Sequence, residues 1–150
     1  MERSRRIIPP VWFAFALAAM VALHRFAPLG RFIELPLAWA GLAPLIGGLL
    51  MAANAAGAFR RAGTPVLPFT PSTALVTDGF YRWTRNPMYL GLALMLAGVA
   101  VLLGSWSTLL PIAVFAAIIQ GNFILGEERF LEEIFGERYL AYKRSVRRWF

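Results

Sequence analysis

The stretch LVTDGFYRWTRNPMYLG, residues 75–91, passes without a break from a polar segment rich in arginine and aromatic residues into a long apolar run. The apolar run covers residues 88–106 and is long enough to cross a bilayer as a helix, which takes about 17 to 25 residues. Asn86 is a good N-cap and Pro87 suits the first helical position, so this pair predicts the start of the helix. The sequence therefore predicts a polar site at the end of a membrane helix.

The composition of the whole chain is that of a membrane protein. Of the 150 residues, 59% are apolar and 15% are charged, a balance that a soluble domain of this size rarely tolerates. Three more uncharged runs, residues 7–23, 35–59 and 109–125, approach or exceed the length of a membrane helix. We therefore expect an all-α integral membrane protein, a single domain with four transmembrane helices and a cytosolic loop at residues 60–87.

The basic residues indicate how the helices are oriented. With a cytoplasmic N-terminus, only Arg25 and Arg31 of the 15 basic residues fall on the outer side. This positive-inside bias predicts both termini in the cytoplasm, with the chain in an inner or plasma membrane. Attraction to anionic headgroups explains the net charge of +7, so nucleic-acid binding is not expected. The first run also resembles a secretory signal, but no small-residue cleavage site precedes His24, so we expect it to remain as a span.

The cytosolic loop contains side chains suited to ligand binding. Its prolines exclude a continuous helix, and its aromatic content argues against disorder, so the loop is typical of a functional segment. Tyr81, Arg85 and Tyr89 supply aromatic faces, hydroxyls and cationic donors that can hold a polar organic ligand beside lipid. Cysteine is absent and His24 is the only histidine, so we expect neither thiol catalysis nor a metal site built from these residues.

The C-terminal segment predicts a second polar element beside the loop. Apolar residues recur every three or four positions over residues 127–146, which is typical of an amphipathic helix lying on the membrane or under the bundle. Gly136 interrupts the pattern and is a candidate bend. The last residues, 147–150, combine arginine with aromatic side chains and suit the headgroup layer.

Two segments resemble the isoprenylcysteine carboxyl methyltransferase family, which is also similar to phospholipid methyltransferases. They are TALVTDGFYRWTRNPMYLG, residues 73–91, and GEERFLEEIFGERYLAYKRSV, residues 126–146, so the resemblance covers the C-terminal half of the chain and is that of a small prokaryotic-type member. It implies an enzyme dependent on S-adenosylmethionine, with S-adenosylhomocysteine as the product. The acceptor would be lipophilic and partitioned into the membrane, as a small molecule or a lipidated substrate bearing a carboxylate, thiol, amine or lipid headgroup.

The resemblance also implies roles for particular residues. The cofactor pocket would be lined by Thr73, Ala74, Leu75, Val76, Tyr81, Asn86, Pro87, Met88, Tyr89 and Glu127. Arg85 and Asn86 would align the reacting groups. Gln120 and Phe123 share a helix face with Glu127 and would face the acceptor. The loop and the C-terminal helix would fold together as a cap over the cofactor.

Two positions depart from the family pattern. Many members have histidine where this chain has Asn86, and asparagine cannot titrate near neutral pH, so Asn86 is expected to bind or cap rather than transfer a proton. Eukaryotic members have a substrate-binding arginine where this chain has Phe123. A carboxylate acceptor would lack that counter-charge, so prenylcysteine is not the substrate we expect.

Two other interpretations of the chain stay open at this point. Membrane sterol reductases resemble the family near the same C-terminal motifs, so one alternative is a membrane reductase that depends on NADPH. The other is a membrane adaptor without catalysis, in which the polar residues only pack. Thermal stabilisation by S-adenosylhomocysteine would distinguish a methyltransferase from an adaptor.

Overall fold

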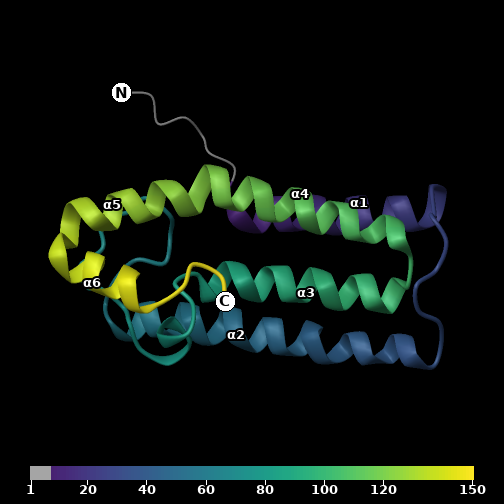
Figure 1. Cartoon of the computed structure of the whole chain (residues 1–150), viewed down its shortest axis with the longest axis horizontal. Helices are drawn as coiled ribbons and strands as arrows, with labels where there is room; N and C mark the ends of the chain where they lie inside the picture. Colours follow the sequence, from purple (N-terminus) through teal and green to yellow (C-terminus); the bar gives the residue numbers. More distant parts are fainter. Residues whose placement is uncertain (1–7) are drawn as a thin grey trace.

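The apolar runs of the chain form helices that lie side by side in two layers (Figure 1). A computed structural model describes residues 8–150. Ile7, where the first predicted run begins, and the basic residues before it lie outside the described residues. The α-helices are α1 (Pro9–Phe26), α2 (Leu42–Arg61), α3 (Pro87–Leu103), α4 (Leu109–Ile119), α5 (Leu125–Phe135) and α6 (Glu137–Ser145). No named strand occurs over residues 8–150, which confirms the predicted all-α class.

Three helical segments are long and apolar enough to cross a membrane. They are Pro9–Phe26, Leu37–Arg61, in which a short 3₁₀ helix precedes α2, and Trp106–Phe135, which joins α4 to α5. The chain is therefore an integral membrane protein. α3 is apolar but has 17 residues, at the lower limit for a span.

Close backbone approach joins α2 to α3. A Cβ atom added at Gly98 would lie 2.6 Å from the carbonyl oxygen of Gly41, and one added at Gly91 would lie 2.6 Å from that of Gly48. Small residues at such crossings let helix backbones touch in a membrane, where no hydrophobic force drives helices together. The start of α3, which carries the polar stretch, is therefore fixed against α2.

The C-terminal third differs from the predicted single helix over residues 127–146. The helix of the fourth apolar run does not end at residue 125, since it continues through a π-helical turn, Gln120–Ile124, into α5 and past Gly126. The amphipathic segment then divides into α5 and α6 at Gly136, whose φ of 51° is one that glycine adopts without strain. The amphipathic helix expected over residues 127–146 is therefore two helices, which meet at Gly136, the expected bend.

The loop between α2 and α3 and the pair α5–α6 meet at the same end of the bundle (Figure 1). The loop contains a short 3₁₀ helix, Gly79–Arg82, just before α3 begins. The C-terminus returns to lie beside the start of α3. The loop with the start of α3, and the pair α5–α6 with the chain end, thus surround one region at the end of the membrane helices.

Candidate functional site

A cavity lies between the loop, the start of α3, α5 and α6. Its empty volume, counted out to open solvent, is about 800 Å³. Phe69, Leu75 and Val76 of the loop form an apolar wall. Polar groups enter from the other elements, so the cavity combines an apolar lining with a few fixed polar atoms.

Tyr89 and Glu127 join two sides of this cavity. The Tyr89 hydroxyl donates a hydrogen bond of 3.0 Å to Oε1 of Glu127, although the two residues are 38 positions apart in the chain. Tyr89 comes from the first turn of α3 and Glu127 from the first turn of α5. Both residues line the cavity, where the second Glu127 oxygen can accept a hydrogen bond from a ligand.

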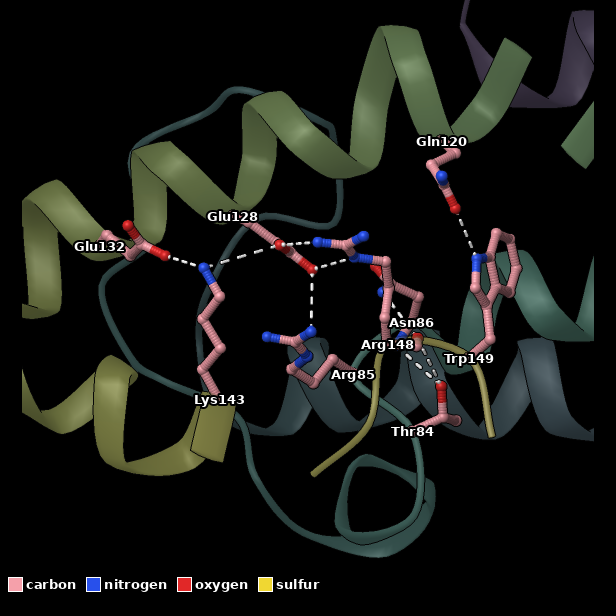
Figure 2. A network of polar contacts seen from close by, with 9 residues as sticks. All are labelled: Thr84, Arg85, Asn86, Gln120, Glu128, Glu132, Lys143, Arg148 and Trp149. Carbon is pink, nitrogen blue, oxygen red and sulfur yellow. Dashed lines mark hydrogen bonds and ion pairs between the residues drawn. The ribbon is translucent and has the colours of Figure 1, made fainter. Parts of the chain in front are cut away.

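Glu128 lies at the centre of a cluster of cations (Figure 2). Its carboxylate accepts hydrogen bonds of 2.9 Å from both Nε and Nη2 of Arg148, and Nη2 of Arg85 lies 3.4 Å from Oε1. Lys143 of α6 pairs with Glu128 at 3.9 Å and also with Glu132. The bond to Glu128 raises the pKa of Arg148. These contacts connect α5, α6, the chain end and the loop.

Arg85 has donor capacity that the protein does not use. Its side chain is 9% exposed and lines the cavity, yet among residues 8–150 no acceptor bonds its Nε or Nη1 atoms. A buried donor without a partner costs roughly 1 to 3 kcal/mol, so such donors are uncommon in folded proteins. A polar or anionic ligand in the cavity would supply the acceptors.

The chain end folds back over the start of α3, and residues 147–149 are called the C-terminal clasp below. The Arg85 amide donates to the Arg147 carbonyl at 2.9 Å, while the Thr84 hydroxyl and the Asn86 side-chain amide both donate to the Arg148 carbonyl, at 3.0 and 2.9 Å. Asn86 is the N-cap residue of α3, as predicted, but its side chain binds the clasp and makes no capping hydrogen bond.

The clasp also reaches the π-helical turn. Nε1 of Trp149 donates a hydrogen bond of 2.9 Å to Oε1 of Gln120, and the Trp149 ring packs against the buried core (Figure 2). The polar groups of Arg148 and Trp149, which were expected to suit the headgroup layer, bind Glu128 and Gln120 of the protein. Local sequence carries no signal for this return of the chain.

Three tyrosines beside the cavity are neutral at physiological pH. Burial raises the pKa of Tyr139 to about 12, with a further contribution from the Glu128 charge. Burial also raises the pKa values of Tyr81 and Tyr142 above their usual range, and the Tyr142 hydroxyl donates a hydrogen bond of 2.6 Å to the Tyr81 carbonyl. These side chains offer ring faces and hydroxyl donors but cannot serve as bases near neutral pH.

Most of the predicted site residues lie on this one cavity. Those that line it are Ala74, Leu75, Val76, Tyr81, Arg85, Asn86, Met88, Tyr89 and Glu127. Two of the predicted cofactor residues lie elsewhere. The Thr73 hydroxyl donates a hydrogen bond of 3.1 Å to the Gly63 carbonyl within the loop, and Pro87 is buried at the start of α3. The cavity also includes Tyr139 and Tyr142, which the sequence argument did not select.

Gln120 and Phe123 do not line the cavity, although they were expected to share a face with Glu127. Gln120 binds Trp149, and Phe123 lines a separate groove beside α1. The expected face assumed regular α-helical spacing, whereas the π-helical turn at Gln120–Ile124 widens the helix between these residues and Glu127. Phe123 still contacts the cavity wall, since its ring centroid lies 6.5 Å from that of Tyr89.

Fold and site together define a class of protein, the α-helical integral membrane proteins with a cavity at one end of the bundle that combines an apolar lining with a few polar groups. Residues 37–138 match the model of the phospholipid methyltransferase family. The chain belongs to this family, which confirms the resemblance seen in its motifs.

Several relatives match about half of the chain. The chain is 38% identical over 76 residues to a protein-S-isoprenylcysteine O-methyltransferase of Schizosaccharomyces pombe, and 38% identical over 72 residues to protein-S-isoprenylcysteine O-methyltransferase A of Arabidopsis thaliana. These matches cover 48% of this chain in both cases, but 30% and 36% of the two enzymes. An uncharacterized protein of Haemophilus influenzae is 40% identical over 62 residues, which are 41% of this chain and 98% of that protein.

A solved structure shares the fold over nearly the whole chain. The eukaryotic intramembrane Ras methyltransferase ICMT (isoprenylcysteine carboxyl methyltransferase) superposes with a TM-score of 0.66 at 19% identity. The match covers 97% of this chain and 52% of that one, so the chain spans about half the length of the solved protein. At this identity the comparison establishes the membrane fold.

Proposed function

We propose that this protein transfers a methyl group from S-adenosylmethionine to a lipophilic acceptor in the membrane. The observation that carries the proposal is the cavity itself, in which the Tyr89–Glu127 pair lies beside the unpaired donors of Arg85. Membership of the family and the names of the relatives support methyl transfer.

The residues present fit the proposed cofactor by the chemistry of their groups. Leu75, Val76 and Met88 offer an apolar surface for an aromatic base. Glu127 would accept hydrogen bonds from a ribose or an ammonium group, and the free donors of Arg85 would bind a carboxylate. When bound, S-adenosylmethionine supplies an electrophilic methyl group on a sulfonium. The rings of Tyr81 and Tyr89 would favour that cation, each by roughly 0.5 to 2 kcal/mol.

The protein's part in the reaction is alignment and exclusion of water. A displacement at a sulfonium needs the two reacting groups in line and needs little acid or base catalysis when the acceptor already has a free electron pair. The neutral tyrosines and Asn86 provide no base near pH 7. Glu127 is assigned to the cofactor in this proposal, so the acceptor class that fits is a thiolate, a carboxylate or an amine on a lipophilic body, rather than a neutral alcohol.

The orientation of the protein belongs to the same proposal. α3 lies against α2 along its length, so we infer that it crosses the bilayer as the fourth span, making four spans in total. Both termini then lie in the cytoplasm with the loop, and the membrane is an inner or plasma membrane. The cavity would be reached by a soluble cofactor from the cytoplasm and by the acceptor from the bilayer.

Isothermal titration with S-adenosylhomocysteine tests this function. Replacing Glu127 by Gln removes the charge that the cofactor would contact, and we expect at least a tenfold loss of affinity, since a hydrogen bond to a charged group contributes about 1.5 to 3 kcal/mol. Glu133→Gln is the matched control, because Glu133 is an exposed carboxylate on the same helix. Equal affinity in the two variants, or binding of NADPH in place of S-adenosylhomocysteine by the natural protein, would contradict the proposal.

A further inference from the structure

A second hollow lies outside the cofactor cavity, between α1 and the π-helical turn. Its empty volume, counted out to open solvent, is about 1,050 Å³. Trp12 of α1 forms one side, while Asn122 and Arg129 contribute an amide and a guanidinium from the other. Phe123 separates this hollow from the cavity, since it lines the hollow and packs against the Tyr89 and Phe69 rings, with centroids 6.5 and 6.3 Å away.

An apolar crevice between α1 and α4 begins at the same tryptophan. α1 lies against α4 (Figure 1), and the crevice between them has an empty volume of about 610 Å³. It extends along α1 from Trp12 to Leu23, which at the rise of an α-helix is about 16 Å. Half of a hydrocarbon core of about 30 Å is roughly 15 Å, so the crevice has the length of one membrane leaflet.

The hollow, which adjoins the crevice at Trp12, carries a positive charge. Arg129 is exposed, and within residues 8–150 no carboxylate lies within ion-pair distance of its guanidinium. Arg85, Lys143 and Arg148, the basic residues around Glu128, are by contrast paired with acidic side chains. The Asn122 amide adds a hydrogen-bond donor beside Arg129, and the turn that carries it is a π-helical segment, a feature frequent at functional sites.

We propose that the hollow and the crevice together form a binding site for an anionic phospholipid of the surrounding bilayer. The phosphate would lie at Arg129 and Asn122, and one acyl chain would fill the crevice between α1 and α4. Basic pockets between transmembrane helices bind anionic headgroups because guanidinium and phosphate attract each other strongly beside lipid. This lipid is a bound partner distinct from the methyl acceptor, and the site does not depend on the proposed methyl transfer.

Native mass spectrometry of the purified full-length protein tests the proposal. The probe is an equal mixture of dioleoyl phosphatidylglycerol and dioleoyl phosphatidylcholine, which share the same chains and differ in headgroup charge. We expect one lipid to be retained per chain, with about a fivefold preference for phosphatidylglycerol, the preference that one basic residue near a membrane surface supplies.

Two pairs of variants separate the headgroup contact from the chain contact. Arg129→Gln should abolish the preference, while Arg138→Gln, an equally exposed arginine on α6, should leave it unchanged. Ala19→Phe fills the crevice and should reduce retention of both lipids at least fivefold. Ala18→Phe, which adds the same ring at an exposed neighbouring position outside the crevice, should not.

The outcomes against the proposal are specific. Equal loss of preference in Arg129→Gln and Arg138→Gln would show general surface attraction and overturn the site at Arg129. Equal retention in Ala19→Phe and Ala18→Phe would overturn the acyl-chain site. Retention of both lipids in equal amounts by the natural protein would overturn the whole proposal.

Discussion

At the residue scale, the contact between Tyr89 and Glu127 is one that the sequence could indicate. The family motifs predicted that both residues line one pocket, and in the structure the Tyr89 hydroxyl donates a hydrogen bond of 3.0 Å to Glu127. Their roles toward a cofactor stay predictions. The partners of Asn86 were not predictable, because its side-chain amide binds a carbonyl 62 residues away, and neither local propensity nor helical spacing encodes that contact.

Replacing Tyr89 by Phe tests the residue-scale account. The change keeps the ring but removes the donor that orients Glu127, so we expect affinity for S-adenosylhomocysteine to fall about tenfold, as for loss of one hydrogen bond to a charged group. Tyr139→Phe is the control, since Tyr139 also lines the cavity but, within the described chain, its hydroxyl has no hydrogen-bond partner. Isothermal titration that gave the same affinity for both variants would refute an orienting role for Tyr89.

At the element scale, helix positions were predictable and helix connections were not. The apolar runs coincide with α1, with α3 and with the segment Leu37–Arg61 that contains α2, to within three residues at the ends that the structure describes. The continuation of α4 into α5 was missed because charged residues begin at residue 127, and charge was taken to end the element. The helix in fact continues through Gly126 and the charged residues after it. The π-helical turn likewise has no signature in the apolar periodicity.

The C-terminal clasp gives the element-scale prediction. Deleting residues 148–150 removes the pair of hydrogen bonds from Arg148 to Glu128 and the bond from Trp149 to Gln120. We expect destabilisation by roughly 3 kcal/mol, together with weaker binding of S-adenosylhomocysteine, because Asn86 loses the Arg148 carbonyl that holds its side chain. Thermal unfolding in detergent and titration measure the two effects.

The control for this deletion is removal of Phe150 alone. Phe150 is 84% exposed, so its loss should change neither the unfolding temperature nor the affinity. A purely structural clasp would lower the unfolding temperature and leave affinity at 10 °C unchanged, and that pattern would contradict the positioning role.

At the scale of the whole molecule, hydropathy and charge together predict the membrane fold, and family membership supports it. Hydropathy could not predict that the loop, the start of α3, the pair α5–α6 and the chain end meet at one end of the bundle. It locates helices but does not indicate which of their faces are in contact. The glycine pairs that fix α2 against α3 become informative only when both helices are seen.

The absence of cysteine makes the proposed orientation directly testable. Leu29→Cys, in the exposed turn after α1, and Glu137→Cys, at the exposed start of α6, introduce single thiols at opposite ends of the bundle. In intact cells we expect a membrane-impermeant maleimide to label Cys at position 29 and to label position 137 only after permeabilisation. The reverse pattern would invert the topology, and labelling of both in intact cells would exclude the proposed four-span arrangement.

The most direct test of the central claim is a crystal structure of the protein soaked with S-adenosylhomocysteine. The account predicts the nucleoside between the loop and Glu127, with the ligand carboxylate on Nε or Nη1 of Arg85. A ligand bound elsewhere, or an empty cavity at saturating ligand concentration, would contradict it.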